Sequence, residues 1–254
     1  MWKPLRNTSI ALIFISFAVI LTGCAEDKTL IKRQSLANQN LGKSFLAQGD
    51  FTAGLNQLLK AEELDPENPE IQYNLALGYR FMNVHSKAIT HFKKAIELKQ
   101  NFSEAYNDLG NTYLIISKWD LAITCFEKAL ENTLYATPHF AQNNLGQAYY
   151  KKGEYNKAVE SYRKAIKYQP SFSMAFHNLG ITYEAMNEWD KAVGAYKESI
   201  QYAPKDPRSH FYLGKLYLKR NKPSLAIEKF EESIRLDKTN TFAPKAKHLL
   251  ETIK

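Results

Sequence analysis

A short Leu-small-x-x-aromatic segment recurs six times in the 254-residue chain, and this recurrence constrains the fold more than any other feature. Its leading residues are Leu41, Leu75, Leu109, Leu145, Leu179 and Leu213. They are separated by 34, 34, 36, 34 and 34 residues. A fixed period of this length is typical of repeat arrays, in which each unit buries its apolar face only against its neighbours.

Other positions of the repeat alternate between small and large residues. Twelve residues after the small residue of the segment, the chain has Gly54, Ala88, Ala122, Ala158, Ala192 or Ala226. Four residues later it has Leu58, Phe92, Phe126, Tyr162, Tyr196 or Phe230. Small and large residues at helical spacing predict two amphipathic helices in each unit, with the small residues where the helices approach closely.

A turn is expected between the two helices of each unit. The residue at that point is Gly49, Asn83, Ser117, Gly153, Asn187 or Asn221. Five of these six are Gly or Asn, which tolerate the left-handed backbone that ends many helices. Pro66, Pro170 and Pro204 close three of the units, where they would end the second helix and begin the next unit.

In its period and in these positions, the chain resembles the tetratricopeptide repeat (TPR) proteins. The resemblance implies an all-α fold, a right-handed TPR superhelix (α-solenoid) of six helix-turn-helix repeats plus a C-terminal capping helix. The expected repeats are 35–68, 69–102, 103–138, 139–172, 173–206 and 207–240. The third is two residues longer than the others, and we expect its loop to absorb the insertion. The cap is expected at 241–254, with Leu249, Leu250 and Ile253 facing the last repeat.

The first 23 residues predict a lipoprotein signal peptide. Lys3 and Arg6 form a short positive region, and residues 10–21 are almost entirely apolar. A helix of this length rises about 18 Å, less than the ~30 Å hydrocarbon core of a bilayer, so a secretory signal fits better than a spanning helix. The sequence Leu21-Thr22-Gly23-Cys24 then resembles the lipobox of bacterial lipoproteins. This resemblance implies a diacylglyceryl group on Cys24, cleavage before it, and N-acylation, for example by palmitate.

Residues 24–34 are expected to form the lipidated N-terminus and a short polar tether. Residue 25 is Ala. Aspartate at this position tends to retain the lipoproteins of enteric-type Gram-negative bacteria in the inner membrane. The expected location is therefore the cell envelope, anchored by lipid in the outer membrane and facing the periplasm. An uncleaved N-terminal anchor with an incidental cysteine is the alternative.

The TPR resemblance also implies a partner-binding groove, lined by positions 2, 5, 9, 12 and 13 of each unit. The candidates are Leu36, Leu46, Tyr73, Leu77, Phe81, Leu114, Phe140, Tyr150, Phe211, Lys215 and Lys219. The same positions also include Gln147, Lys151, Met174, His177, Ile181 and Arg208. Exposed aromatic residues with a polar surround suit an extended or helical peptide, although any one of these side chains could instead pack on a neighbouring helix.

Catalytic and metal-binding patterns are missing from the sequence. No two of the six histidines stand at helical i, i+3 or i+4 spacing, and no H-E-x-x-H, phosphate-binding glycine loop or G-x-S-x-G occurs. The formal charge of +8 is dispersed over the expected helices, which argues against binding to nucleic acid. We therefore expect no enzymatic activity, metal, cofactor or small-molecule substrate, and read Cys125 as a core thiol.

The whole arrangement resembles a narrower group, the type IV pilus biogenesis/stability lipoproteins of the PilF/PilW (pilotin) type. The resemblance rests on the lipobox, the six repeats and the segment Thr133-Leu134-Tyr135 at the end of the third. It implies a scaffold that escorts a secretin subunit to the outer membrane and aids its multimerisation. A general envelope adaptor for cell-wall enzymes or a protease is the alternative. An enzyme with a hidden site is a third hypothesis, but the repeats and cap leave no room for a catalytic domain.

Overall fold

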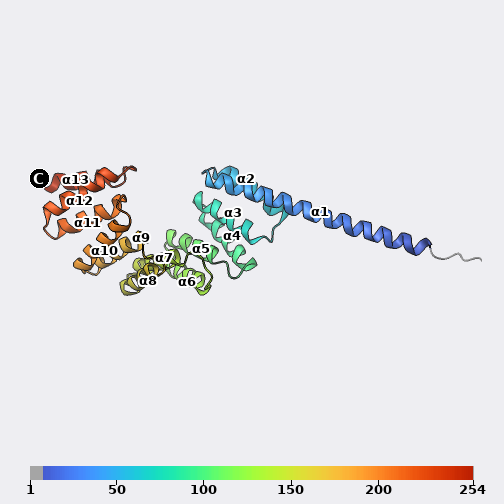
Figure 1. The fold of residues 1–254 in the computed structure, drawn as a ribbon, viewed down its shortest axis with the longest axis horizontal. Helices are drawn as coiled ribbons and strands as arrows, with labels where there is room; N and C mark the ends of the chain where they lie inside the picture. Colours follow the sequence, from blue (N-terminus) through green and yellow to red (C-terminus); the bar gives the residue numbers. More distant parts are fainter. Residues whose placement is uncertain (1–7, 254) are drawn as a thin grey trace, which may run out of the picture. The chain divides into compact units, whose positions relative to one another are not determined.

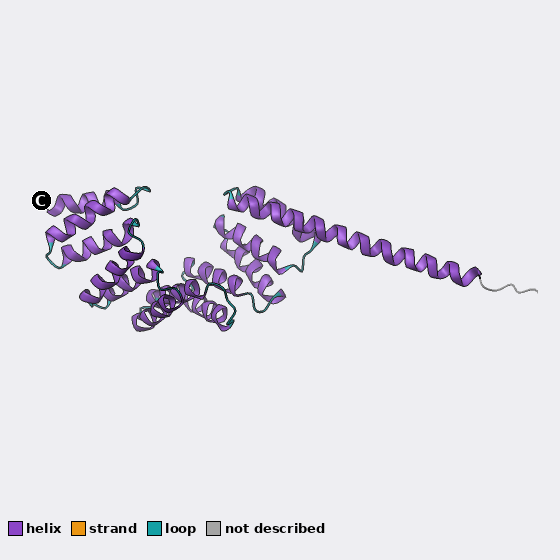
Figure 2. Ribbon diagram, in the orientation of Figure 1, coloured by secondary structure: helices purple, strands orange, loops and turns teal. Residues whose placement is uncertain are grey.

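The computed structural model describes the backbone of residues 8–253 and the side chains of residues 28–253. Every helix or strand assigned in that range is an α-helix (Figures 1 and 2). The helices are α1 (Thr8–Ala47), α2 (Phe51–Leu64), α3 (Pro69–Phe81), α4 (His85–Leu98), α5 (Ser103–Ile115), α6 (Trp119–Glu131), α7 (Pro138–Lys151), α8 (Tyr155–Tyr168), α9 (Ser173–Ala185), α10 (Trp189–Tyr202), α11 (Pro207–Lys219), α12 (Pro223–Leu236) and α13 (Ala243–Ile253). Lys3, Arg6 and the side chain of Cys24 lie outside the described residues.

The helices form two compact units, a first that ends at Ala105 and a second that begins at Tyr106. In the first unit, α1 packs on α2, α2 on α3, and α3 on α4. In the second, each helix from α6 to α12 packs on the one that follows it. This sequential packing of short helices confirms the predicted all-α fold of paired-helix repeats.

The predicted turns between paired helices are confirmed in all six repeats. Asn83, Ser117 and Asn187 have φ angles of 60°, 59° and 60°, and the other three turn residues also have positive φ. In each turn the next residue returns its backbone N–H to a carbonyl five residues earlier, for example from Val84 to Tyr79 at 2.8 Å. This hydrogen bond satisfies a carbonyl at the end of the first helix. It requires a residue with positive φ at the turn, which explains why the turn position is Gly or Asn in five of the six repeats.

Glycines allow the paired helices to approach closely, as the pattern of small and large residues predicts. A Cβ atom added to Gly110, Gly146 or Gly180 would lie 2.4–2.6 Å from a ring carbon of the aromatic residue on the paired helix. These aromatic residues are fully or almost fully buried, and they are Phe126, Tyr162 and Tyr196. Each ring therefore fills the space that the missing Cβ leaves.

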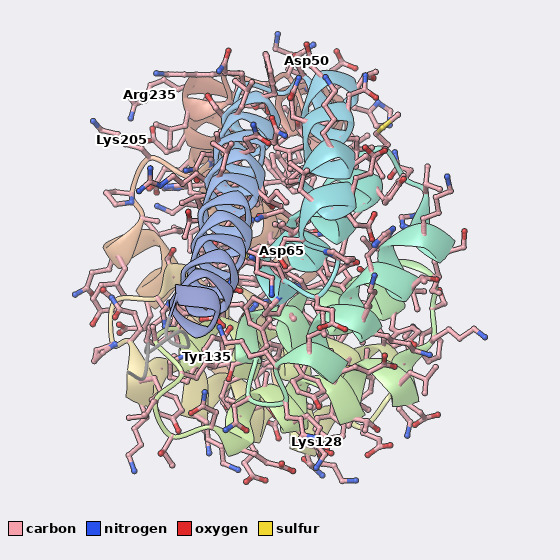
Figure 3. All side chains as sticks on the ribbon, turned by 90° about the vertical axis from the view of Figure 1, so that its right-hand side faces the viewer. Asp50, Asp65, Lys128, Tyr135, Lys205 and Arg235 are labelled. Carbon is pink, nitrogen blue, oxygen red and sulfur yellow. The ribbon has the colours of Figure 1, made fainter. Side chains whose placement is uncertain are left out.

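Helix ends follow the prolines and polar caps of the sequence. Pro66, Pro170 and Pro204 each stand two residues after the last residue of α2, α8 or α10. At the start of α2, Asp50 accepts a hydrogen bond from the backbone N–H of Ala53, and Figure 3 shows Asp50 and Asp65 at the two ends of this helix. These local signals set the helix boundaries.

The last helix, α13, packs on α12 and covers the end of the second unit. Leu249, Leu250 and Ile253 are partly buried against the core of that unit, as is Phe242 just before the helix. Asp237 accepts hydrogen bonds from the backbone N–H groups of Phe242 and Ala243 and so fixes the start of α13. Burial raises the pKa of Asp237, but these backbone N–H donors outweigh it, so the pKa falls to about 2.

Helix α1 continues through the segment that we expected to be a tether. Residues 28–34 are helical and exposed, and Ser35 is the first buried residue of the described side chains. The Ser35 hydroxyl donates a hydrogen bond to the carbonyl of Ala61 at 3.0 Å, which joins α1 to α2. No helix in the described part of the chain is both long and apolar enough to cross a membrane.

The two extra residues of the third repeat lie in the loop between α6 and α7. Tyr135 is buried in this loop, in a cluster with Ala129 and Ala141. Its neighbour Leu134 is 89% exposed. The Asn132 side chain accepts a hydrogen bond from the backbone N–H of Leu134. The burial of Tyr135 and the hydrogen bond of Asn132 therefore both fix the conformation of the loop.

Candidate protein-binding surfaces

Five predicted groove residues lie in the first unit, on α1 and α3. Leu36 and Phe81 are 54% and 49% exposed, whereas Leu46, Tyr73 and Leu77 are half-buried. A half-buried apolar side chain is held in place by its neighbours and still offers part of its surface to a partner. These residues are therefore accessible to different degrees.

Aromatic contacts hold two of these residues in defined orientations. The ring of Phe81 stacks on Phe51 with centroids 5.1 Å apart, and the guanidinium of Arg80 lies 5.3 Å from the Phe81 centroid. The ring of Tyr73 lies between Phe92 and Phe102, at centroid distances of 5.9 and 5.0 Å. Rings held in this way lose little conformational freedom when a ligand covers them.

Leu46 has a packing role in addition to its partly exposed surface. Its side chain fills the space beside Gly54 and Gly78, where an added Cβ would lie 2.7 and 3.4 Å from its Cδ2 atom. A substitution of Leu46 would therefore disturb the packing of α1 on α2 and α3 as well as any bound partner.

In the second unit, Leu114, Phe140 and Tyr150 are accessible to different degrees. Phe140 is 46% exposed and packs edge-on against Phe172, with centroids 5.3 Å apart. Leu114 and Tyr150 are half-buried. Burial raises the pKa of Tyr150, so its hydroxyl is a neutral hydrogen-bonding group at physiological pH.

Phe211 is not an accessible surface residue, contrary to the prediction. It is only 6% exposed, and its ring packs against Phe230 and Phe242 with centroids 6.0 and 5.5 Å apart. Phe242 precedes the terminal helix and has no counterpart in the repeat pattern. The same position of the repeat is also buried as Gln39, Asn143 and His177, so contacts within the repeats bury it and Phe242 adds to them in the last repeat.

The predicted lysines of the last repeat are exposed and lie over aromatic rings. The Lys219 Nζ is 4.1 Å from the centroid of Trp189, and the Lys215 Nζ is 5.4 Å from the centroid of Tyr212. A lysine over a ring retains its charge and its contact with water while its orientation is restricted. This part of the second unit therefore presents oriented positive charge.

A cavity of about 400 Å³ in the second unit collects further groove positions. It is lined by Gln147, Tyr150, Lys151, Tyr162, Met174, His177, Asn178, Ile181 and Arg208. Its only charged lining residues are the cations Lys151 and Arg208. Tyr150, Met174 and Ile181 supply apolar surface, so the cavity combines apolar contact with a preference for negative charge.

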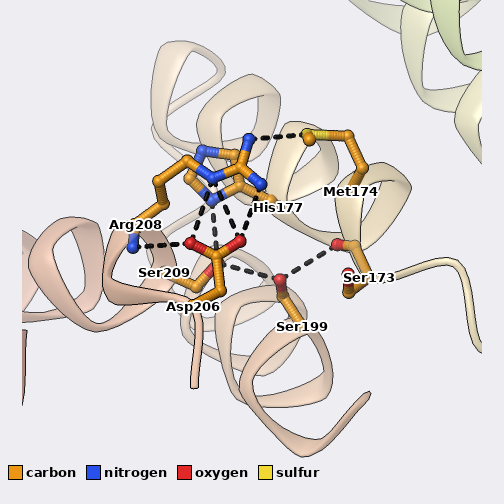
Figure 4. A network of polar contacts seen from close by, with 7 residues as sticks. All are labelled: Ser173, Met174, His177, Ser199, Asp206, Arg208 and Ser209. Atoms are coloured by element: carbon orange, nitrogen blue, oxygen red, sulfur yellow. Dashed lines mark hydrogen bonds and ion pairs between the residues drawn. The ribbon is translucent and has the colours of Figure 1, made fainter. Parts of the chain in front are cut away.

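The cation Arg208 is oriented by Asp206 (Figure 4). The Arg208 Nε and Nη2 atoms donate to the carboxylate of Asp206 at 2.7–3.1 Å, and its Nη1 lies 3.3 Å from the sulfur of Met174. Burial disfavours the charged form of Asp206, but the hydrogen bonds and charge of Arg208 outweigh it and lower the pKa of Asp206. The guanidinium is thus fixed before any ligand binds.

A buried hydrogen-bond chain supports this part of the cavity (Figure 4). The Nδ1 atom of His177 lies 2.8 Å from the Ser209 hydroxyl, which lies 2.8 Å from the Ser199 hydroxyl. Ser199 also donates to the carbonyl of Ser173 at 2.9 Å. Burial, together with the positive charge of Arg208, lowers the pKa of His177 to about 4, so His177 is neutral at pH 7.

Side-chain amides connect three successive first helices of the second unit. Asn144 donates to Asn107 at 3.1 Å, and Asn178 donates to Asn143 at 2.8 Å. Asn144 and Asn178 were not among the predicted groove residues, because they lie one position beyond those that the resemblance implied. The signal was present, since asparagine occupies this position in four of the six repeats, as Asn40, Asn74, Asn144 and Asn178.

Family models that describe the tetratricopeptide repeat match most of the chain. One matches residues 42–80 and 146–187, and others match 69–102, 91–124 and 177–241. Curated relatives include the BBSome complex member BBS4 of Bos taurus, 23% identical over 65% of this chain. Another is superkiller complex protein 3 of Mus musculus, 26% identical over 41% of this chain. The chain spans only 31% and 7% of the length of these two relatives.

Solved structures also match, two of them over a larger share of the chain. PilW, a type IV pilus biogenesis factor, is 21% identical, with a TM-score of 0.76 over 85% of this chain and 98% of its own. PilF of Pseudomonas aeruginosa is 18% identical, with a TM-score of 0.73 over 86% and 99%. The MamA protein is 30% identical, with a TM-score of 0.59 over 65% and 95%. The chain therefore belongs to the tetratricopeptide repeat proteins, and its fold is similar to that of PilW and PilF.

Proposed function

We propose that this protein is a lipid-anchored, non-enzymatic scaffold of type IV pilus assembly, a pilotin that aids the localisation and multimerisation of a secretin. The observation that carries the proposal is the extent of the structural similarity. The structural similarity covers 98% of PilW and 99% of PilF, so it supports a scaffold of the same extent. The lipobox that ends at Cys24 supplies the expected membrane anchor.

The position of Cys24 sets the distance between the membrane and the binding surface. Ser35, the first buried residue of the described side chains, comes eleven positions after Cys24. At about 1.5 Å per residue, a helix of that length spans about 16 Å. The lipid would hold the first repeat close to the periplasmic surface of the outer membrane, where a secretin subunit must be retained before it assembles.

The client segment would bind the exposed apolar residues of the first unit, Leu36, Tyr73, Leu77 and Phe81. Covering the exposed halves of Leu36 and Phe81 would contribute about 1 kcal/mol each. Binding of this kind requires an apolar segment, because none of these four residues has a charged group that could pair with a polar segment. An apolar segment of a membrane-bound pore subunit fits this requirement.

A general envelope adaptor for cell-wall enzymes or a protease is the second candidate, and the cations of the second unit favour it. Lys151 and Arg208 line the cavity, and Arg208 is oriented by Asp206. Lys215 and Lys219 are exposed on α11 of the same unit. Such a surface suits an acidic partner rather than an apolar one. The two candidates therefore predict different partners at different residues.

The deciding experiment is a crosslinked pull-down from membranes with the mature, lipidated protein, followed by mass spectrometry. The pilotin proposal expects a secretin as the dominant partner, and its loss in the Tyr73→Ala, Phe81→Ala double variant. Tyr168→Ala is the matched control, because this exposed tyrosine lies in the second unit, at the end of α8. Recovery of hydrolases or a protease in place of a secretin would favour the adaptor.

Lipid delivery requires its own test. In Cys24→Ser cells, the secretin should lose its outer-membrane location although the variant still binds it in extracts. Unchanged secretin localisation would contradict the proposed mechanism. Reproducible turnover of any substrate by the pure protein would contradict the non-enzymatic assignment.

A further inference from the structure

A further cavity of about 410 Å³ in the second unit lies between α6, α7 and α8. Leu130 of α6, Gln142 of α7 and Ser161 of α8 line its inner part, and Gln142 and Ser161 are buried. Glu127 and Glu160 also line it and are exposed, so the cavity is open to solvent. It shares no lining residue with the cavity that contains Arg208.

The side-chain amide of Gln142 lacks a hydrogen-bond donor. Gln142 is only 8% exposed, and its Oε1 atom is buried without a hydrogen-bond partner among the described residues. Most buried polar atoms in folded proteins have a partner, because an unpaired one loses its hydration without compensation. The cavity therefore presents an acceptor for a donor that the described part of this chain does not supply.

The second repeat shows the same glutamine with its partners in place. Gln72 and Gln142 are the fourth residues of the second and fourth repeats. The Oε1 atom of Gln72 accepts a hydrogen bond from the Nδ1 of His91 at 2.8 Å, and its Nε2 donates to Glu62 at 2.8 Å. His91 belongs to the second helix of the same repeat, and Glu62 to the second helix of the preceding one.

The fourth repeat has neither partner. Ser161 stands at the repeat position of His91, and Leu130 of the preceding repeat stands at that of Glu62. A serine is much shorter than a histidine, and the Ser161 hydroxyl donates to the carbonyl of Lys157 at 3.0 Å. Leu130 has no polar group to offer. The cavity thus corresponds to the space that a hydrogen-bonding ring fills in the second repeat, and a donor from another molecule could complete it.

The charges of the lining favour a cationic donor. The lining includes the carboxylates of Glu127, Glu131 and Glu160 and only two cations, Lys157 and Lys164. Both lysines are already paired, Lys164 with Glu160 at 2.7 Å and Lys157 with Glu154 at 2.7 Å. Neither lysine is therefore free to compensate the remaining carboxylates.

Glu127 is the lining carboxylate without a cation. Glu131 pairs with Lys128 at 2.9 Å, whereas Glu127 makes no ion pair within the described residues. Glu127 accepts a hydrogen bond from the Tyr149 hydroxyl at 3.1 Å. Burial and the charge of Glu127 raise the pKa of Tyr149 to about 12, so this hydroxyl is a neutral donor at pH 7. The negative charge of Glu127 thus remains available to a ligand.

We propose that this cavity binds an arginine side chain of a partner protein, whose guanidinium donates to Gln142 Oε1 and to the carboxylate of Glu127. A guanidinium keeps its charge when buried and has five N–H donors in one plane, so it can serve acceptors on two helices. A histidine would lose its charge, since burial is the main cause that lowers the pKa of His91 in the second repeat. An ammonium group acts as a point charge without this planar fork. The site is separate from the surface that the proposed function assigns to the secretin.

Three small probes separate charge from shape. The first is N-acetyl-arginine-N-methylamide, in which the caps remove the charges of the free amino acid. The citrulline analogue has an uncharged urea of nearly the same shape, and the lysine analogue has the charge without the fork. Each is titrated against the full-length lipoprotein in uncharged detergent, with binding followed by ligand-observed NMR. We expect the arginine probe to bind at least about fivefold more tightly than either analogue.

Variants of the lining locate the site. Glu127→Gln should weaken arginine binding by about fivefold and leave citrulline binding unchanged, because only the charge is removed. Gln142→Leu should weaken both, because both probes donate N–H groups. Ser161→His should block all three probes, since the introduced imidazole would fill the cavity and donate to Gln142 as His91 does to Gln72.

Glu231→Gln is the matched control. Glu231 is an exposed carboxylate at the same repeat position as Glu127, in the last repeat, and it does not line the cavity. This variant should leave the binding of all three probes unchanged. The Tyr73→Ala, Phe81→Ala variant should also leave it unchanged, so failure of the secretin proposal and failure of this one are distinguishable.

Every other result overturns the proposal. If no probe binds, the cavity holds only water. Equal binding of the arginine and citrulline probes would exclude recognition of charge, and tighter binding of the lysine probe would exclude the fork. Arginine binding that survives Glu127→Gln and Ser161→His, or that Glu231→Gln weakens equally, would place the contact elsewhere on the surface. Glu127→Gln changes an exposed side chain, so it keeps the test valid if a variant of the buried residues fails to fold.

Discussion

Alanine substitution of two glycines in the same helix pair should change stability in opposite directions. Gly180 faces Tyr196, and an added Cβ would lie 2.4 Å from its Cε1 atom. Gly194, in the interior of the neighbouring helix α10, has no atom within 4 Å of such a Cβ. Gly194→Ala should therefore stabilise the protein by about 0.5–1 kcal/mol, because alanine restricts the unfolded chain more than glycine does.

For Gly180→Ala, the same gain of about 1 kcal/mol is opposed by overpacking. An ordinary carbon contact is about 3.5–4 Å, so the ring must move by about 1 Å or the helices must separate. Overpacking of this kind costs about 1–3 kcal/mol. The Tyr196 hydroxyl also donates to Glu184 at 2.5 Å, which limits the movement of the ring. We expect a net loss of up to about 2 kcal/mol.

The second repeat suggests how to relieve this strain. It has Ala76 at the position of Gly180 and Phe92 at the position of Tyr196, and both are fully buried. A phenylalanine ring without the hydroxyl anchor can shift to accommodate the methyl group. Tyr196→Phe should therefore recover about 0.5–1 kcal/mol of the loss in the Gly180→Ala background, as measured by a double-mutant cycle.

The assay is urea unfolding followed by circular dichroism, with hydrogen exchange of α9 and α10 as a local readout. The local readout is needed because long repeat arrays can unfold in parts. If Gly180→Ala stabilises the protein as much as Gly194→Ala does, the close approach at Gly180 does not constrain the fold, and the argument from packing is wrong.

The remaining predictions concern the turns, the loop of the third repeat and pH. Asn187→Ala should cost about 1 kcal/mol because alanine tolerates a φ of 60° poorly, and Asn187→Gly should restore stability in the same urea assay. Tyr135→Ala should cost about 3 kcal/mol, whereas Leu134→Ala should change the free energy of unfolding by less than about 0.5 kcal/mol. The pKa of His177 is about 4 in the folded protein against 6.5 in the unfolded chain, so the unfolded chain binds more protons between these values. Stability should fall by about 3 kcal/mol as the pH drops from 6.5 to 4, and His177→Gln should flatten that part of the pH profile of unfolding.

The sequence predicted the repeated parts of the fold because they depend on local chemistry. A left-handed turn selects Gly or Asn, and even Ser117 adopts it, because the flanking helices hold its backbone. Close helix approach selects a glycine opposite a large ring, as at Gly146 and Tyr162. Each of these constraints acts within one repeat, so the spacing in the sequence contains the whole signal.

The surfaces were harder to predict because their exposure depends on elements outside the repeat. Phe211 has the sequence position of a groove residue, but Phe242 packs against it. Leu41 has the sequence position of a core residue, yet it is 45% exposed, because within the described residues no second helix of a preceding repeat packs on that side of α1. Residues 28–34 are polar enough to suggest a tether, but composition does not reveal that a helix would continue through them.

The positions that differ most among the repeats show why one scaffold can carry separate recognition sites. The fifth position of the repeat is Tyr73 in the second repeat, Asn143 in the fourth and His177 in the fifth. Each is held by neighbours that require no ligand: aromatic rings around Tyr73, an amide beside Asn143 and a serine beside His177. Tyr73 is half-buried and still reaches the surface, whereas Asn143 and His177 are buried and support the residues that line the surface around them. The apolar surface of the first unit and the cationic cavity of the second can therefore change independently, and a variant that removes one should leave binding at the other intact.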